Sequence, residues 1–259
     1  MRFIRYRDKK TNQPAWGWVL EDQVGRLEGS PFEEYRRLEP EWDQALVEFL
    51  APVAPSKIIC VGRNYASHAR EHNVEVPELP LLFLKPTSAV IGPNHPIYIP
   101  PQAQRVEHEA ELAVIIGKCG RWIPTEEAKD HILGYTISND VTARQLQRSD
   151  GQWTRGKGFD TFCPLGPWIE TNLDPADTLI TCRVNDEMRQ MASTREMVYT
   201  IPQLIAFASS FMTLMPGDVL LTGTPAGVGP LREGDRIEID IEGIGLLRNH
   251  VEREPERST

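Results

Sequence analysis

An apolar run that begins with closely spaced glutamates constrains the fold of this chain more than any other stretch. Residues 105–117 read Arg-Val-Glu-His-Glu-Ala-Glu-Leu-Ala-Val-Ile-Ile-Gly, and a series of Val, Ile and Leu that ends at Gly predicts a β-strand. Side chains two residues apart in a strand share a face, so Glu109 and Glu111 point together, away from Leu112 and the alternate residues after it. Two carboxylates on an apolar element repel each other unless a proton or a cation lies between them. The run is therefore a candidate half of a metal site.

A third carboxylate that could complete such a site ends the next apolar stretch. Residues 132–140 read Ile-Leu-Gly-Tyr-Thr-Ile-Ser-Asn-Asp, and Asp140 comes where the predicted strand stops. Three carboxylates without a His or Cys pair favour a hard cation, Mg²⁺ or Mn²⁺, over zinc. Two plainer interpretations stay open: the glutamates belong to the solvated face of an antiparallel strand, and Asp140 caps a following helix.

Length and charge narrow the classes of protein to consider. A chain of 259 residues can bury a large core in one domain, or in a small domain followed by a larger one. Its longest apolar runs fall short of the ~20 residues that span a bilayer, and its N-terminus lacks the uninterrupted apolar segment of a signal peptide. Basic residues are scattered in a chain of net charge −9, which opposes nucleic-acid binding. We therefore expect a cytoplasmic protein without membrane or nucleic-acid partners.

The cysteines predict neither a zinc knuckle nor a disulfide framework. No Cys-x-x-Cys pair occurs, and the thiols lie far apart in the chain, at Cys60, Cys119, Cys163 and Cys182. We expect them to be free and buried. A cysteine hydrolase that uses Cys60 is a weak alternative, because this residue lies inside an apolar strand without groups that would stabilise a thiolate.

Two sequence patterns divide the chain near residue 55. Residues 1–30 alternate with period two and contain turn signals, which predicts a small antiparallel unit. Apolar residues from Trp42 to Phe49 recur at helical spacing, which predicts a helix over residues 41–50 that the prolines of residues 51–55 then end. We therefore expect a small N-terminal α+β domain over residues 1–55, a main domain over residues 56–252 and a polar tail over residues 253–259.

The main domain reads as short strands joined by loops rich in Pro and Gly, with few helices. Alternating βαβ units are largely missing, so a mostly β, rolled or barrel-like mixed sheet fits better than a doubly wound one. The predicted helices are Thr125 to His131 and Ile201 to Ser210. The predicted strands are Lys57 to Val61, Leu81 to Leu84, Glu111 to Ile116, Leu133 to Ser138, Leu179 to Val184, Asp218 to Thr222 and Arg236 to Ile241.

Further candidates for chemistry lie in three polar segments. His68 and Glu71 are three apart in a segment expected to be helical, so the carboxylate can orient the imidazole as a general base; an ordinary surface pair is the alternative. His72 has no such partner and is expected to face solvent. Lys157 could stabilise an enolate or oxyanion, or be an ordinary loop lysine. The loop around Thr224 offers hydroxyls and backbone amides that could hold a carboxylate.

Together these motifs resemble the fumarylacetoacetate hydrolase family, in its branch of acylpyruvases and 2-hydroxyhepta-2,4-diene-1,7-dioate isomerases. The resemblance covers residues 57–251. It rests on Gly62-Arg-Asn-Tyr-Ala-Ser-His68, Glu109-Ala-Glu111-Leu, Asn139-Asp140-Val-Thr-Ala-Arg144, Lys157-Gly-Phe-Asp-Thr-Phe-Cys-Pro-Leu-Gly-Pro167 and Thr222-Gly-Thr-Pro-Ala-Gly-Val-Gly229. The resemblance implies a mixed β-roll of the family's C-terminal domain type, assembled as a homodimer.

The resemblance also implies roles for single residues. The family commonly has Asp where this chain has Gln145, so the hydrogen bonding of Arg144 is an open question. A lid over Tyr65 to Pro80 is expected to be mobile without ligand. The implied roles are one Mg²⁺ or Mn²⁺ held by Glu109, Glu111 and Asp140, a water-activating dyad of His68 and Glu71, an anion-stabilising Lys157, and substrate contacts from Arg144, Gln147 and Thr224.

The resemblance implies a metal-dependent enzyme that acts on 2-oxo or 2,4-dioxo acids through a metal-bound enolate. The candidate reactions are C–C hydrolysis of acylpyruvates, decarboxylation or tautomerisation of oxaloacetate, and isomerisation of 2-hydroxyhepta-2,4-diene-1,7-dioate or decarboxylation of 5-carboxymethyl-2-oxo-hex-3-ene-1,7-dioate. Because hydrolysis needs a base to aim water, which His68 and Glu71 supply, we rank hydrolysis first. A non-catalytic metal-binding module is the alternative from another class, and it would not need His68, Glu71 or Lys157.

Overall fold

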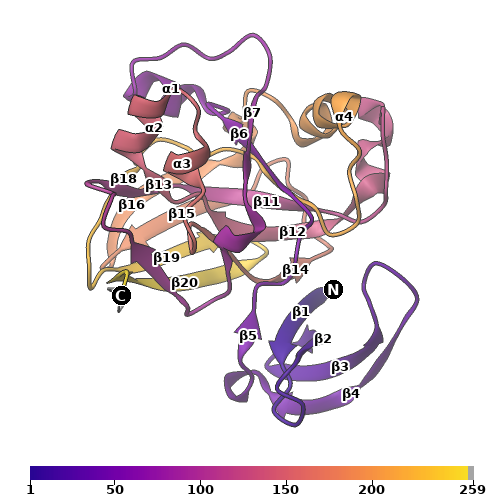
Figure 1. The fold of residues 1–259 in the computed structure, drawn as a ribbon. Coiled ribbons are helices and arrows are strands. Elements are labelled where there is room, and N and C mark those ends of the chain that lie inside the picture. Colours follow the sequence, from indigo (N-terminus) through magenta and orange to yellow (C-terminus); the bar gives the residue numbers. More distant parts are fainter. Residues whose placement is uncertain (256–259) are drawn as a thin grey trace.

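Residues 1–255, which the computed structural model describes, fold into three β-sheets with few helices (Figure 1). The largest sheet has the strand order β4-β3-β2-β1-β14-β12-β11-β17-β6-β7, with β5 paired to β1 and β8 to β14. Its strands are β1 (Arg2–Arg7), β2 (Pro14–Leu20), β3 (Gln23–Gly29), β4 (Tyr35–Asp43), β5 (Phe49–Leu50), β6 (Ile58–Gly62), β7 (Leu81–Lys85), β8 (Val90–Ile91), β11 (Ala110–Ile116), β12 (Ile132–Asn139), β14 (Cys163–Glu170) and β17 (Val219–Leu221).

Two smaller sheets and a few helices complete the described chain. The five-stranded sheet has the order β16-β15-β19-β20-β9 and the three-stranded sheet the order β13-β10-β18. Their strands are β9 (Pro96–Ile99), β10 (Val106–His108), β13 (Thr142–Ala143), β15 (Leu179–Val184), β16 (Glu187–Ser193), β18 (Gly229–Leu231), β19 (Arg236–Ile241) and β20 (Gly245–Arg253). The helices are α1 (Ala66–Glu71), α2 (Arg144–Asp150), α3 (Thr154–Lys157) and α4 (Ile201–Phe211), with 3₁₀ turns η1 (Gln44–Leu46), η2 (Thr87–Ala89), η3 (Thr125–His131) and η4 (Thr194–Glu196). Across residues 1–255, none of the helices is long and apolar enough to cross a membrane.

β11 lies in the middle of the largest sheet, between β12 and β17, and both of its faces are buried. Leu112 and Val114 pack into the core that includes the five-stranded sheet, while Ala113 and Ile115 pack into a second core that includes residues of the N-terminal strands. A strand covered on both faces needs apolar side chains at nearly every position, which explains the unbroken apolar run. Because β11 lies in the middle of the sheet, the glutamates at its start are also buried.

The N-terminal unit of residues 1–55 contains strands and one 3₁₀ turn, so the helix predicted over residues 41–50 is wrong. β4 continues to Asp43, with Trp42 opposite Val24 of β3 and its ring 5.6 Å from that of Tyr6. A helix as short as the predicted one is marginal by itself, whereas the strand pairing and the aromatic contact partly bury Trp42. Within the described chain, the expected α+β domain is therefore an all-β unit.

The seven strands predicted for the main domain are present as β6, β7, β11, β12, β15, β17 and β19, each with ends within one residue of the prediction. The predicted mostly β fold is thereby confirmed, as is the helix now labelled α4. The segment from Thr125 to His131 is a 3₁₀ turn and not an α-helix. β14 was not predicted, because Pro164 and Pro167 lack the backbone donor that a strand normally supplies.

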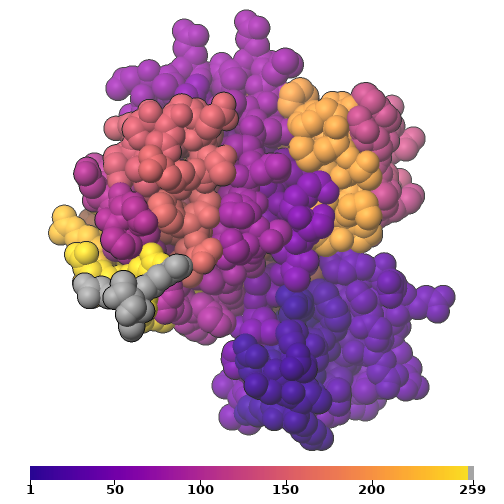
Figure 2. Space-filling view, in the orientation of Figure 1, coloured from indigo at the N-terminus to yellow at the C-terminus, as the bar shows by residue number. Residues whose placement is uncertain are grey.

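The N-terminal unit joins the main domain through the sheet itself. β1 pairs antiparallel with β14, with Arg2 opposite Glu170 and Phe3 opposite Ile169. Phe3 belongs to the same apolar cluster as Ile115 of β11. In the space-filling view the N-terminal unit forms a lobe below the main body, in contact with it (Figure 2). The predicted boundary near residue 55 therefore falls between two parts that share a sheet.

Candidate active site and metal centre

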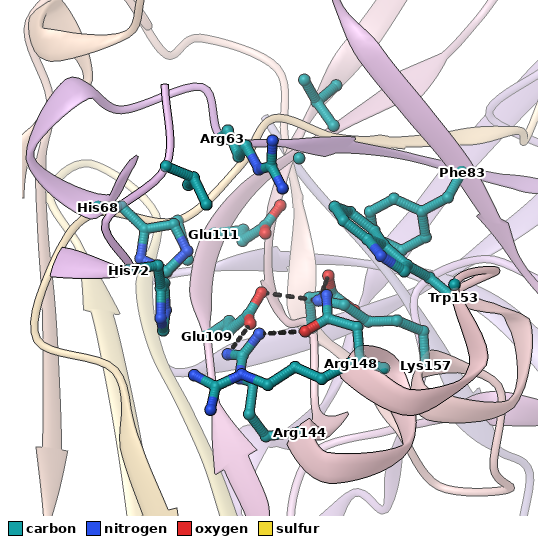
Figure 3. Close-up of a pocket in the computed structure, with 17 residues that line it drawn as sticks. Arg63, His68, His72, Phe83, Glu109, Glu111, Arg144, Arg148, Trp153 and Lys157 are labelled. Carbon is teal, nitrogen blue, oxygen red and sulfur yellow. Dashed lines mark hydrogen bonds and ion pairs between the residues drawn. The ribbon is translucent and has the colours of Figure 1, made fainter. Parts of the chain in front are cut away.

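One cavity of about 540 Å³ collects most of the side chains that the sequence singled out (Figure 3). Its walls come from the end of β6, from α1, β7 and the start of β11, from the residues after β12, and from α2, α3 and the loop after β17. The ninth predicted site residue, Glu71, is outside the wall but contacts His68. The other eight line the cavity: His68, Glu109, Glu111, Asp140, Arg144, Gln147, Lys157 and Thr224.

The pairing of β11 with β12 brings the three carboxylates together. Ala110 lies opposite Asn139, and the Asp140 amide donates to the Glu109 carbonyl oxygen at 2.9 Å. One carboxylate oxygen from each of Glu109, Glu111 and Asp140 lies within 4.8 Å of the others. All three residues are at least 96 % buried. The solvated strand edge considered for the glutamates is therefore wrong.

Cations on the protein neutralise two of these carboxylates. Lys157 Nζ donates to Glu109 at 2.8 Å and to Asp140 at 2.5 Å, and Arg144 Nη2 donates to Glu109 at 2.5 Å. Burial opposes ionisation of Glu109, but the nearby Lys157 and Arg144 charges hold its pKa far below its usual range. Lys85 Nζ adds a contact to Asp140 at 2.6 Å. Glu109 is thus held as an anion, and Asp140 has two ammonium partners.

Glu111 differs from these two carboxylates because no cation of the described chain neutralises it. Its carboxylate accepts a hydrogen bond from the Gly223 amide at 2.7 Å and, within the described residues, contacts no Lys or Arg side chain. Burial, with the neighbouring Asp140 and Glu109 charges, raises the pKa of Glu111 well above its usual value. An oxygen-only donor set with one carboxylate that lacks a cation fits a hard divalent ion such as Mg²⁺ or Mn²⁺. Glu109, Glu111 and Asp140 could therefore hold such an ion, and its identity stays open.

α1 places an imidazole at the opposite wall of the cavity from Lys157 (Figure 3). His68 Nδ1 lies 3.4 Å from Glu71 Oε2, and the Glu71 carboxylate also accepts the Gly227 amide at 3.2 Å. Burial lowers the pKa of His68, so its neutral, basic form prevails at neutral pH. His72 was expected to face solvent but lines the cavity, with its ring centroid 4.6 Å from that of His68. The reason is that residues four apart on a helix share a face.

Arg144 is well bonded in spite of Gln145. Its Nε donates to Glu107 at 2.7 Å and its Nη1 to Gln147 at 2.5 Å, in addition to the Glu109 contact. Gln145 turns the other way and bonds the backbone of Arg105 at 3.2 Å. The question that the sequence left open at position 145 is therefore answered: the guanidinium already has carboxylate partners on β10 and before β11.

The predicted substrate contact Thr224 is held in place on both sides of its hydroxyl. Thr224 Oγ1 donates to the Ala110 carbonyl oxygen and accepts from Gln190 Nε2, each at 2.8 Å. Gln190 was not singled out from the sequence, although its Oε1 also accepts the Ala110 amide at 3.1 Å. The loop after β17 is thus tied to the start of β11, next to the carboxylate cluster.

Sequence reasoning also missed several residues at the cavity. Lys85 is fully buried beside Asp140, and the one signal for it was a lysine at the end of an apolar strand. Arg63 and Arg148 line opposite sides of the cavity, and neither guanidinium forms a salt bridge within residues 1–255 (Figure 3). Phe83 and Trp153 form an aromatic wall, with ring centroids 5.1 Å apart. Nothing in their spacing along the chain indicated that they meet.

The thiol alternative is not supported. Cys60 is fully buried, and this burial raises the pKa of its thiol well above the usual value, with the Asp140 charge adding to the effect. A thiol that resists ionisation is a poor nucleophile. Of the four cysteines, Cys119 is exposed, so the expectation that all are buried is wrong at this position.

The fold and the cavity define an enzyme of mostly β architecture with a carboxylate-rich active site. The chain belongs to the fumarylacetoacetate hydrolase family: the fumarylacetoacetate (FAA) hydrolase C-terminal pattern matches residues 57–252, and the Rv2993c-like N-terminal pattern matches residues 1–52. Members of this family are enzymes, which argues against the non-catalytic module considered above.

Named relatives carry more than one activity. The chain is 48% identical over 218 residues to the mitochondrial oxaloacetate tautomerase FAHD2B of Bos taurus, covering 79% of this chain and 69% of the relative. The crystal structure of 2-hydroxyhepta-2,4-diene-1,7-dioate isomerase from Mycobacterium marinum matches with a TM-score of 0.91 and 42% identity, over 98% of this chain and 100% of that one. Maleylpyruvate hydrolase from Sphingobium sp. SYK-6, in complex with manganese and pyruvate, matches with a TM-score of 0.81 and 36% identity, with the same coverage.

Proposed function

We propose that this protein is a divalent-metal-dependent enzyme that interconverts the keto and enol forms of a 2-oxo diacid of the oxaloacetate kind. The observation that carries the proposal is the convergence, in one cavity, of the carboxylate cluster, the imidazole of His68 and the ammonium of Lys157. Bound at Glu109, Glu111 and Asp140, Mg²⁺ or Mn²⁺ would supply Lewis acidity toward a 2-oxo acid. The relative named as an oxaloacetate tautomerase supports this choice of reaction.

His68 is the residue suited to move the proton. Its imidazole is neutral at neutral pH because burial lowers its pKa, and it faces the cavity next to Glu109. The neutral imidazole can take a proton from C3 of the keto acid and return one to the enolate oxygen or to C3. Glu71 orients the ring through the Nδ1 contact, so that the other ring nitrogen is left for the substrate. Because the keto and enol forms contain the same atoms, the reaction needs no second substrate.

Lys157 and the arginines suit the charge of such a substrate. The Lys157 ammonium is buried beside the carboxylate cluster, where it can stabilise negative charge that develops on an enolate oxygen. Arg63 and Arg148 add two guanidiniums without protein partners in the described chain. Because Arg binds carboxylates well, a substrate with a second carboxylate fits this cavity better than a neutral acyl chain.

C–C hydrolysis of an acylpyruvate is the second candidate. The specific observation in its favour is the His68–Glu71 pair, since a dyad of this kind can activate water as well as move a substrate proton. The similar maleylpyruvate hydrolase also acts on a compound that carries two carboxylates, as its name says. Hydrolysis, which the sequence ranked first, therefore stays open.

A panel of substrates tests the proposal. Purified protein with Mn²⁺ or Mg²⁺ is mixed with enol-oxaloacetate, maleylpyruvate, acetylpyruvate and 2-hydroxyhepta-2,4-diene-1,7-dioate, and the wild type is compared with H68A and E111Q. H250A is the matched control, because His250 is exposed on β20, outside the cavity. We expect rapid ketonisation of enol-oxaloacetate by the wild type and H250A, and at least about 10²-fold slower ketonisation by H68A.

Each outcome of the panel has a clear meaning. Cleavage of maleylpyruvate or acetylpyruvate that outpaces ketonisation would replace the tautomerase proposal with the hydrolase. Ketonisation that is no faster with wild-type protein than with the same metal ion alone would reject an enzymatic role, because free divalent ions already promote the enolisation of oxaloacetate.

A further inference from the structure

α1 carries a second cluster of ligand groups that the proposed reaction does not fully use. His68, Glu71 and His72 occupy positions i, i+3 and i+4, and one ligand atom from each lies within 4.8 Å of the others. The two imidazole rings stand edge to face, with centroids 4.6 Å apart. Two histidines four apart on one helical face is a spacing that holds zinc in proteins. The cluster is separate from Glu109, Glu111 and Asp140, which contribute oxygen alone.

The state of each side chain favours a ligand. His72 Nε2 is buried and has no hydrogen-bond partner among the described residues, which is costly for a polar nitrogen unless something binds it. Glu71 is held by the Gly227 amide, with both carboxylate oxygens 3.2 Å from that nitrogen. His68 is 93 % buried. Two nitrogens and one carboxylate are therefore partly fixed around a common point.

We propose that His68, Glu71 and His72 form a second metal site, selective for a borderline cation such as Zn²⁺, whose occupation inhibits the enzyme. Imidazole nitrogens prefer Zn²⁺ over Mg²⁺, and three protein ligands leave a fourth position for water. The ion takes the nitrogen lone pair that His68 needs as a base. The inhibition, but not the binding, rests on the proposed function. Zn²⁺ at this site lowers the activity of the enzyme while Mg²⁺ or Mn²⁺ occupies the carboxylate cluster.

Zinc binding is measured first, without any substrate. Zn²⁺ is titrated into protein saturated with Mg²⁺ by calorimetry, and every variant also carries C119S so that the one exposed thiol does not contribute. We expect one Zn²⁺ per chain in the parent and in E111Q, and a dissociation constant raised at least about 10-fold in H72Q and H72F. H250Q is the matched control and should bind like the parent. Loss of Zn²⁺ binding in E111Q but not in H72Q would place zinc at the carboxylates and overturn the proposal, as would the absence of Zn²⁺ binding.

Two further measurements separate this proposal from the reaction. Electron paramagnetic resonance of Cu²⁺ bound to the Mg²⁺-saturated protein should show two coupled imidazole nitrogens in the parent and one in H72F, which retains an aromatic ring at this position. Inhibition of ketonisation by Zn²⁺ should weaken at least about 10-fold in H72Q, judged against the rate of that same variant with Mg²⁺ and without Zn²⁺. Equal inhibition of H72Q and H250Q would reject the regulatory role even if zinc binds. Should the protein prove inactive on every substrate, the calorimetric and resonance results still decide whether the site exists.

Discussion

Glu111 differs from Glu109 and Asp140 because it has no lysine or arginine partner among the described residues. Glu109 and Asp140 each contact Lys157, whereas Glu111 accepts one backbone amide and has a raised pKa. A buried carboxylate without a cation exchanges its proton for a metal ion at little cost, because the ion removes the repulsion that raised the pKa. We therefore expect Glu111 to be the carboxylate on which metal binding at this cluster would depend most.

We expect E111Q to abolish the rise in Tm that Mn²⁺ produces in the wild type and to lower kcat by roughly 10³-fold, since a bound metal contributes several kcal/mol of charge stabilisation. E107Q is the matched control, because Glu107 is a buried glutamate of the same run that bonds Arg144 and Arg105 and is not part of the carboxylate cluster. E107Q should keep the Mn²⁺-induced rise in Tm. Thermal unfolding with and without Mn²⁺ is the measurement, and an equal rise in E111Q and wild type would contradict the assignment.

We expect the pH dependence of the proposed reaction to report on His68. Burial lowers its pKa, and the charges around it act in both directions: Glu109 and Glu71 raise the pKa, while Arg144 lowers it. In the proposed reaction the active form is the neutral base, which is present above the pKa and lost as the pH falls through it. We therefore expect the acidic limb of kcat/KM to lie below pH about 6.5, the ordinary value for His.

E71Q shifts that limb in a defined direction. The Glu71 charge and hydrogen bond both favour protonated His68, so their removal should move the acidic limb to lower pH and reduce the plateau by up to about 10²-fold. The measurement is a pH profile of kcat/KM for wild type and E71Q. A limb that moves to higher pH, or that does not move, would exclude His68 as the titrating base.

At the scale of residues, sequence periodicity predicted the carboxylate cluster but not its partners. Glu109, Glu111 and Asp140 lie on strands whose alternation and ends can be read from the chain. Lys85, Arg63 and Arg148 come from other segments, and only the folded chain brings them to the cavity. His72 was misjudged because a polar residue near a helix end usually faces solvent. The family resemblance, and not the spacing, carried the roles of Arg144 and Gln147.

At the scale of elements, the loop after β17 connects α1 to the rest of the main domain. Gly227 donates its amide to Glu71 and has a φ of +99°, a conformation that favours glycine. A Cβ atom here would clash with the carbonyl oxygen of Arg189 on β16. The loop therefore holds Glu71, and through it His68, at a fixed place in the cavity wall. The predicted mobility of residues 65–80 stays a prediction.

We expect G227A to destabilise the protein by about 1–3 kcal/mol and to lower kcat, because both the backbone conformation and the amide bonded to Glu71 are disturbed. G234A is the matched control: Gly234 has a similar φ of +86°, but a Cβ there meets no atom within 4 Å. G234A should lose less stability and no activity. Urea unfolding and turnover of both variants provide the test, and equal effects in the two would show that backbone strain alone, and not the contact, matters.

The elements that the sequence predicted wrongly share a physical cause. The apolar spacing of residues 41–50 suits a helix, but Trp42 gains more by pairing across to β3 and packing on Tyr6. β14 contains two prolines and still lies inside the sheet, because β12 shifts its register beside it. In both cases contacts with distant parts of the chain override local preference. In strands with a strong apolar pattern, such as β11 and β12, the local preference and the long-range contacts agree, so the sequence predicted them correctly.

At the scale of the whole molecule, two sequence families share one sheet. The patterns over residues 1–52 and 57–252 are distinct, yet β1 pairs with β14 and Phe3 packs in the same cluster as Ile115. Arg2 and the amino group of Met1 also contact Glu170 at 3.1 and 3.2 Å. The N-terminal unit therefore covers a sheet edge that would otherwise be exposed. The expected homodimer and cytoplasmic location stay predictions, the first of which light scattering can test.

We therefore expect removal of residues 1–52 to impair the folding of the remaining chain. If the two parts were independent domains, the remaining chain would fold normally. The fragment of residues 53–259 would expose the β14 edge and lose the cover of Phe3, Trp18 and Leu27 over the apolar cluster. Each large apolar side chain contributes roughly 1.5–3 kcal/mol when buried, and an uncovered strand edge promotes aggregation. We expect this fragment to aggregate, while the full chain unfolds in one cooperative transition. Co-expression of residues 1–52 as a separate chain is the control and should restore solubility, since pairing and not chain connection is what the edge needs. A fragment that stays monodisperse with the Tm of the full chain would show that the shared sheet contributes nothing to stability.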